Sequence, residues 1–260
     1  MASIHTNRGI GRARKARAAL GLPPDQPLPD VVATLEERAG VHVVVLDLGD
    51  EVAGAYLTRR DRPLLFVNGT QPTGRQRFTV AHEYAHHHLQ HGSVVDDEAA
   101  LGGLVGDPRE VEANAFAAEF LVPRAAVERR FPVRPAPVTL ETVVRVACAF
   151  GVSARMARIR LATCGVLADD ALRDRLDRRI QEGEHLELIE RLGLGEPDDA
   201  VAAAAAAGPP RIPPALRDSP LGRFVDGGLG IADVARHIGR PAADVDRALS
   251  ACGVPSPGAG

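Results

Sequence analysis

The spacing of apolar residues changes from a helical period to a strand period within the first seventy residues. Two stretches with apolar residues at helical spacing, 10–22 and 30–39, predict helices, the second of which ends at Gly40. Three runs rich in β-branched residues predict short strands: 41–48, 53–58 and 64–67. The polar residues 59–63 predict a hairpin between the last two strands. A small sheet is therefore expected early in the chain.

Helix start and stop signals mark the elements that follow this sheet. Thr73-Gly74-Arg75-Gln76 has the spacing of a capping box and predicts the start of a long helix. Asp107-Pro108 predicts another helix start, with Asp107 as N-cap, and Pro123 marks the end of that helix. We expect four residues to form its buried stripe: Val111, Ala115, Ala118 and Val122. Two further helices are predicted at 140–150 and 154–163.

The chain is expected to divide into three parts. Residues 1–166 form the main domain, and residues 167–210 form an acidic helical segment with an Ala- and Pro-rich linker. The linker itself is expected at 196–214. Residues 211–260 form a small helical module.

The C-terminal module has the residue pattern of a helix-turn-helix. Its small, turn and apolar positions are Ile231, Val234, Ala235, Gly239 and Val245. Its second helix would present Asp244 and Asp246, with only Arg240 and Arg247 as basic residues, which does not favour phosphate contacts. Direct DNA binding and a packing or partner-docking role both remain open for this module.

Composition excludes several functional classes. Of the 260 residues, 45% are hydrophobic and 25% charged, and a net charge of -3 provides no general attraction to nucleic acid or membranes. The bias toward arginine over lysine, with abundant alanine, glycine and proline, indicates a GC-rich bacterial genome. Three widely separated cysteines are expected to be reduced thiols.

The sequence has neither a signal-peptide pattern nor an apolar run of about 18 residues, the length that a membrane span needs. We therefore expect a cytoplasmic protein.

His82-Glu83-Tyr84-Ala85-His86 is the most informative segment for chemistry. Histidines four residues apart on a helix direct their imidazoles to one metal ion, and Glu83 is placed to accept a proton from a water activated by that ion. Zinc (Zn2+) is the expected cofactor. The alternative is that Glu83 is only a solvated helix residue.

Helix geometry excludes the other nearby histidines as ligands. If the helix continued, His87, His88 and His91 would point roughly 120°, 140° and 160° away from the midpoint of His82 and His86. We therefore expect them to be surface or packing residues.

Glu110 is the best candidate for the third ligand that a catalytic zinc requires. With Asn114 one turn later, it resembles metallopeptidases in which a second helix supplies a glutamate ligand and a polar partner for a ligand histidine. Glu110 could instead complete a capping box with Asp107. The rival carboxylates are Glu112, which would lie about 200° around the helix, and the weaker candidates Glu119, Asp96, Asp97 and Asp107. Candidate donors to a developing oxyanion are Tyr56, Tyr84, His87 and several arginines.

Two sequence blocks carry a family resemblance. Residues 77–86, Arg-Phe-Thr-Val-Ala-His-Glu-Tyr-Ala-His, and residues 110–123, Glu-Val-Glu-Ala-Asn-Ala-Phe-Ala-Ala-Glu-Phe-Leu-Val-Pro, resemble the ImmA/IrrE metallopeptidases. The similarity extends to 151–153 and 160–161 and covers roughly residues 10–166. Ala85 stands where the family often has Gly, and 120–123 replaces the commoner Leu-Leu-Met-Pro. Because few residues precede the first predicted strand, we expect no N-terminal DNA-binding domain of the kind that many members carry.

This resemblance implies a fold, a mechanism and a substrate class. The expected fold is α+β and zincin-like, a small sheet plus helices, followed by a helical C-terminal extension. His82, His86 and Glu110 are the implied metal ligands, and Glu83 is the implied general base. Asn114 is the implied hydrogen-bond partner of a ligand histidine. The implied substrate is an XRE-type helix-turn-helix repressor, cut once to release transcription of stress, mobile-element or resistance genes. The alternative is a non-catalytic, zinc-containing regulator that binds protein or DNA.

Overall fold

The computed structural model describes most of the chain up to residue 195 and short parts beyond it. The described residues are 3–46, 48, 52–57, 63–91, 94–97, 107–130, 138–195, 211–218, 232, 236 and 241–243. The predicted linker residues 196–210 and nearly all of the predicted helix-turn-helix lie outside this described part.

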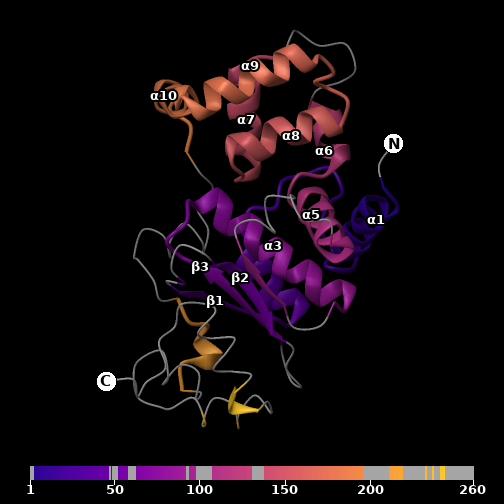
Figure 1. Ribbon diagram of the computed structural model, residues 1–260, viewed down its shortest axis with the longest axis vertical. Helices are drawn as coiled ribbons and strands as arrows, with labels where there is room; N and C mark the ends of the chain where they lie inside the picture. The colour runs from indigo at the N-terminus through magenta and orange to yellow at the C-terminus, as the bar shows by residue number, and fades with distance from the viewer. Residues whose placement is uncertain are drawn as a thin grey trace.

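A mixed four-stranded sheet forms the base of the main domain (Figure 1). Its strands are β1 (His42–Leu46), β2 (Val52–Leu57), β3 (Leu64–Asn68) and β4 (Val94–Asp97), in the order β1-β3-β2-β4. β1 runs parallel to β3, whereas β2 is antiparallel to both β3 and β4. The three predicted strands and the β2–β3 hairpin pairing are confirmed. β4 was not predicted.

Helix α3 (Thr73–Leu89) lies across the sheet and packs on β2 and β3. It begins one residue earlier than a capping box would require, because Pro72 is the N-cap and makes no side-chain cap bond. The Gln76 amide instead donates hydrogen bonds to the carbonyls of Gly69 and Gln71, at 3.2 and 2.7 Å. The predicted capping box is therefore wrong, although the helix itself is confirmed.

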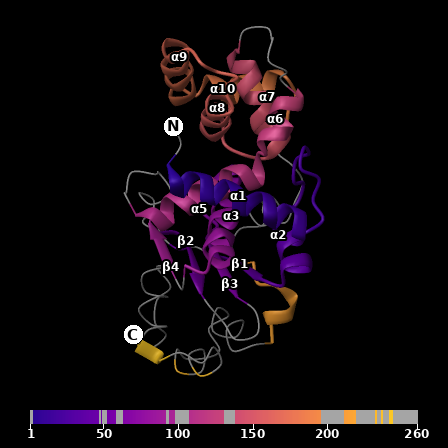
Figure 2. The same cartoon turned by 90° about the vertical axis from the view of Figure 1, so that its right-hand side faces the viewer.

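Two further helices pack in succession on α3 (Figure 2). α5 (Pro108–Leu121) packs on α3, and α1 (Ile4–Ala19) packs on the other side of α5. The two are in close contact at Gly9, where any side chain would collide with the Glu112 carbonyl. The start of α5 is as predicted, with Asp107 as N-cap and Pro108 in the first turn.

The predicted buried stripe of α5 is wrong for three of its four residues. Val111, Ala115 and Ala118 are only partly buried, and Val122 alone is buried as expected. The buried apolar residues of α5 are Ala113, Phe116, Ala117, Phe120 and Leu121. The prediction assumed a single contact face, whereas α5 is packed between α1 and α3.

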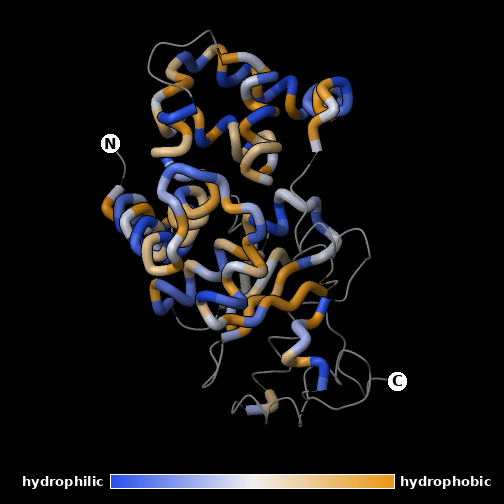
Figure 3. Tube along the Cα trace, turned by 180° about the vertical axis from the view of Figure 1, so that it is seen from behind, coloured by the Kyte–Doolittle hydropathy of each residue, from blue (hydrophilic) through white to orange (hydrophobic). Residues whose placement is uncertain are grey.

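The remaining helices complete the described part of the chain. The second predicted helix is a short α2 (Val31–Thr34) followed by a π-helical turn, η1 (Leu35–Ala39), and it ends at Gly40 with φ 68° as expected. α7 (Leu140–Phe150) and α8 (Ala154–Thr163) have the predicted bounds, with Gly151 and Ser153 as caps. The other elements are α6 (Arg124–Arg130), α9 (Asp170–Gln181), α10 (Glu184–Arg191) and the 3-10 turn η2 (Pro214–Leu216). Figure 3 shows hydrophilic and hydrophobic residues alternating along the upper group of helices, as amphipathic packing requires.

Residues 211–218 return to the sheet, although the predicted linker extends to 214. Arg211 exchanges two backbone hydrogen bonds with Val45 at the open side of β1, at 2.8 and 2.9 Å. Its guanidinium donates to both carboxylate oxygens of Glu36, at 3.1 and 2.7 Å. The end of the predicted linker is thus held against the main domain.

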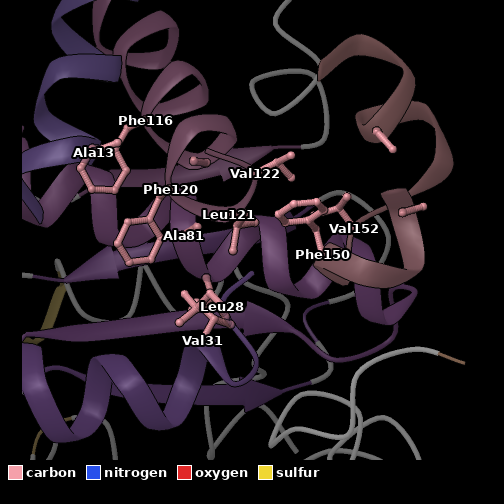
Figure 4. Close-up of a cluster of buried hydrophobic side chains, with 14 of the residues drawn as sticks. Ala13, Leu28, Val31, Ala81, Phe116, Phe120, Leu121, Val122, Phe150 and Val152 are labelled. Atoms are coloured by element: carbon pink, nitrogen blue, oxygen red, sulfur yellow. The ribbon is translucent and has the colours of Figure 1, made fainter. Parts of the chain in front are cut away.

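A continuous apolar core joins the sheet layer to the helices (Figure 4). Phe116 and Phe120 of α5 stack with ring centroids 5.5 Å apart, and Phe150 and Val152 belong to the same cluster from the α7–α8 turn. The fold is therefore α+β, with a small sheet, an overlying helix layer and a helical C-terminal part. No helix among the described residues combines the length and apolarity of a membrane span.

Candidate metal centre

Helix α3 brings two histidines to one point. His82 and His86 lie four residues apart, about 40° around the helix axis, and neither has any exposed surface. Their Nε2 atoms are 3.1 Å apart. This is the arrangement that the histidine spacing predicts.

Glu110 reaches the same point from the first turn of α5. Its Oε2 lies 3.1 Å from His82 Nε2, and its Oε1 lies 3.5 Å from His86 Nε2. The helix cap is supplied by Asp107, whose carboxylate accepts a hydrogen bond from the Arg109 amide at 2.8 Å. The Glu110 carboxylate therefore faces the histidines, which disfavours the capping-box alternative.

The three side chains fit a small tetrahedral metal ion. Within the described part of the chain, His82, His86 and Glu110 form a buried group whose donor atoms all lie within 4.8 Å of one another. Donors at 2.0–2.1 Å from a tetrahedral zinc are about 3.3–3.4 Å apart, close to the 3.1–3.5 Å seen between these atoms. Two imidazoles and one carboxylate are also a donor set of the kind found in catalytic metal sites.

Comparison with known families agrees with this geometry. Residues 36–162 match the peptidase M78 family, described as the IrrE N-terminal-like domain. This segment is an ImmA/IrrE-family domain. It contains the complete group of His82, His86 and Glu110, so the cluster lies in a peptidase domain. A comparison with curated proteins found no match.

Glu83 of the ImmA/IrrE domain is fully buried beside β2. Its carboxylate faces Gly54, and a Cβ atom placed on Gly54 would lie 2.6 Å from Glu83 Oε1 and 2.5 Å from Thr79 Cγ2. The interpretation of Glu83 as a solvated helix residue is therefore wrong. Gly54 was not singled out from the sequence, because its importance depends on how closely the helix approaches the strand.

His91 contacts the metal centre, contrary to the helix projection. α3 ends at Leu89, and Gln90 adopts a left-handed conformation with φ 59°, so His91 is directed back toward the helix. Its Nδ1 lies 3.0 Å from His86 Nδ1 and its Nε2 lies 3.3 Å from Glu112 Oε2. His91 is thus not one of the three clustered residues, but it reaches the outer nitrogen of His86.

This contact favours one tautomer of His86. Burial is the main cause that lowers the pKa of His91, so its ring is neutral near pH 7. A neutral His91 that donates from Nε2 to Glu112 can only accept at Nδ1, from the Nδ1–H of His86. The Nε2 of His86 is then left unprotonated, which is the form that binds a metal.

Glu112 anchors this chain of contacts to the N-terminal helix. It was weighed as a rival ligand, but its Oε1 accepts hydrogen bonds from His5 and Arg8 of α1, each at 2.9 Å. Burial alone would raise the pKa of Glu112, but the hydrogen bonds from His5, Arg8 and His91 together outweigh this and lower it. Glu112 therefore remains ionised and is available as the acceptor for His91.

Glu119, Tyr84 and Tyr56 have partners outside the group of His82, His86 and Glu110, whereas the side chains of Asp96 and Asp97 lie outside the described part of the chain. Glu119 is buried in ion pairs with Arg14 and Arg160 and connects three helices. Tyr84 packs on the core rings, and burial raises its pKa to about 12. The Tyr56 hydroxyl lies 3.1 Å from His87 Nδ1.

Asn114 lies on α5 one turn beyond Glu110, where it lines a pocket with Phe78. Its predicted role as a hydrogen-bond partner of a ligand histidine stays a prediction. The contact of His86 with His91, and of His91 with Glu112, were not predicted from the sequence because both depend on where the helix ends. A histidine five residues after a helical ligand and close to a predicted helix end is the sequence pattern that could have indicated them.

Proposed function

We propose that the chain is a cytoplasmic zinc-dependent endopeptidase that regulates transcription by cutting an XRE-type helix-turn-helix repressor. The observation that supports this most strongly is the convergence of His82, His86 and Glu110 in an ImmA/IrrE domain, with Glu83 buried in the same helix turn. Three protein donors leave one position of a tetrahedral site for water, as catalytic zinc sites require.

In this proposal each residue has a defined task. His82, His86 and Glu110 would hold the zinc, which when bound supplies a Lewis acid that activates water and polarises the scissile carbonyl. Glu83 accepts the proton of the attacking water and delivers it to the leaving amine. His91 and Glu112 keep His86 in its metal-binding tautomer. The buried position of Glu83 excludes bulk water from its carboxylate and suits a group that must exchange protons with substrate.

The substrate proposal rests on the resemblance to ImmA/IrrE metallopeptidases. It predicts one discrete cut in a helix-turn-helix repressor, because a regulatory protease needs only to separate DNA binding from dimerisation or stability. Such a cut would release transcription of stress-response genes.

The direct test is incubation of the zinc-loaded protein with the helix-turn-helix repressor encoded beside its own gene. We expect one cut by the wild type, none after chelation, and none by Glu83→Gln, which should keep its zinc because Glu83 is not a ligand. Glu110→Ala should lose both zinc and cleavage. Mass spectrometry of the fragments and metal analysis of each variant provide the measurements.

Two results would count against the proposal. Cleavage by Glu83→Gln at the wild-type rate would contradict the mechanism. Stoichiometric zinc without any cut would favour the alternative, a regulator that keeps zinc as a structural element and binds protein or DNA.

A further inference from the structure

A pocket of about 290 Å³ lies among four helices, α1, α3, α5 and α8, and each of them contributes residues to its wall. Its apolar lining residues are Ile10, Phe78, Ala115, Ala118, Met156 and Ile159. Ala115 and Ala118 are two of the four residues predicted to form the buried stripe of α5, and their small side chains instead line this pocket.

The pocket adjoins the metal centre along two helices. Phe78 lies one turn before His82 on α3, and their ring centroids are 6.2 Å apart. Asn114 lies one turn after Glu110 on α5. Residues four apart on a helix are about 6 Å apart. The pocket therefore begins one helical turn from His82 and one helical turn from Glu110.

Fixed contacts keep the pocket open. Arg160 of α8 forms a buried ion pair with Glu119 and donates to the Val122 carbonyl at 2.7 Å, which joins α8 to α5. At the other end, a side-chain carbon on Gly74 would lie 2.9 Å from the Ser153 amide nitrogen, so α3 and the start of α8 are in close contact. The walls therefore belong to helices that cannot close on each other without breaking these contacts.

The lining defines the chemistry of an occupant. The volume lies just below the range of about 300–1,000 Å³ typical of small-molecule sites and suits one large side chain rather than a cofactor. Ile159 is 42% exposed at this surface. The lining also includes Arg75 and the exposed Arg155, and none of the described residues that line it carries a carboxylate.

We propose that this pocket is the subsite that receives a large apolar side chain of the protein substrate near the scissile bond, with an acidic neighbour facing Arg155. This proposal rests on the proposed peptidase function, since it assigns part of the substrate specificity of the same site. The occupant is a polypeptide segment in which leucine, methionine or phenylalanine is flanked by glutamate or aspartate.

Binding of labelled peptides to zinc-loaded Glu83→Gln protein tests the proposal without turnover. Three fluorescent peptides differ only at the centre: Glu-Leu-Glu, Glu-Ala-Glu and Lys-Leu-Lys. We expect Glu-Leu-Glu to bind most tightly in fluorescence anisotropy. Adding Ala118→Phe, which fills the pocket, should weaken its binding at least tenfold, since losing an apolar side-chain contact commonly costs about 10–200-fold.

Two further variants separate the pocket from general effects. Ala125→Phe makes the same change at an exposed position on α6 and should bind like the parent. Arg155→Glu, on the exposed face of α8, should reverse the preference toward Lys-Leu-Lys. If Glu-Leu-Glu binds equally to the Ala118→Phe, Ala125→Phe and parent proteins, the pocket is not the subsite.

Cleavage of a peptide library distinguishes failure of this proposal from failure of the proposed function. The wild type should enrich large apolar residues at one position beside the cut, and Ala118→Phe should shift that position to alanine or glycine, mainly through KM. An unchanged profile in Ala118→Phe would overturn the subsite while leaving the peptidase intact. If the library is not cut at all, the peptidase proposal fails, and the anisotropy series still decides whether the pocket binds such segments.

Discussion

In the proposed mechanism Glu83 holds its carboxylate in one position to transfer protons, and Gly54 leaves the space for that carboxylate. The helix α3 lies so close to β2 that a methyl group on Gly54 would collide with both Glu83 and Thr79. Interiors are packed too tightly to absorb such an overlap without moving a side chain. Adding one methyl group at Gly54 would therefore displace the carboxylate of Glu83, the proposed catalytic base.

Gly54→Ala is expected to displace the Glu83 carboxylate while leaving the metal ligands in place. A shift of about 1 Å in a catalytic group can cost about 100-fold in rate, so we expect kcat to fall by about this factor. Zinc content should stay at one per chain. Gly11→Ala is the control, because a Cβ on Gly11 meets nothing within 4 Å. Wild-type kcat in Gly54→Ala would show that this contact does not position Glu83.

Residue spacing together with the family resemblance predicted the cluster of His82, His86 and Glu110 but not its surroundings. His82 and His86 follow from helix geometry, and Glu110 follows from its place at the start of the next helix together with the family resemblance. Gly54 could not be found this way, since no pattern in the sequence gives the distance between a helix and a strand. The same holds for Glu112, whose partners on α1 are more than a hundred residues away.

At the scale of elements, the residue at which α3 ends decides whether His91 can contact His86. The projection of His91 away from the site assumed a helix that continues beyond residue 90. Gln90 ends the helix in a left-handed conformation that favours glycine or asparagine, so the residue type gave no warning. One residue of altered backbone direction brings His91 against His86.

His91→Phe is expected to lower zinc affinity about 10–100-fold, the usual effect of losing a second-layer partner of a ligand histidine. The phenyl ring keeps the bulk but cannot accept the proton of His86 Nδ1. His88→Phe is the matched control, because the His88 ring packs on Tyr84 and Phe116. Competition with a chromophoric chelator measures both affinities.

Equal zinc affinities for His91→Phe and the wild type would show that His86 does not need this partner. An equal loss in His88→Phe would point to a general effect on the helix instead. Circular dichroism of both variants checks that α3 remains folded.

The position of α5 between two helices explains another difference from the sequence prediction. A stripe of small apolar residues normally marks a single buried face, but both α1 and α3 contact this helix. The phenylalanines take the core positions, and Ala115 and Ala118 line the pocket. Helix bounds and caps could be predicted from local signals, whereas the choice of buried face depends on neighbours far away in the chain.

At the scale of the whole molecule, three distant segments build the candidate metal centre and the contacts around it. α1 supplies His5 and Arg8, α3 supplies the histidine pair, and α5 supplies Glu110 and Glu112. The α+β class could be predicted because strand and helix periods alternate clearly along the first half of the chain. The fourth strand and the return of residues 211–218 to β1 could not be predicted, because β4 pairs with the distant strand β2 and Arg211 pairs with Val45 of β1.

The central claim is that His82, His86 and Glu110 hold one zinc with a position left open for water. The most direct test is a crystal structure of the zinc-loaded protein with anomalous diffraction measured at the zinc edge. We predict one peak per chain, bonded to His82 Nε2, His86 Nε2 and the Glu110 carboxylate, with a solvent molecule as the remaining ligand. A peak at another place, or a fourth protein side chain on the metal, would contradict the account.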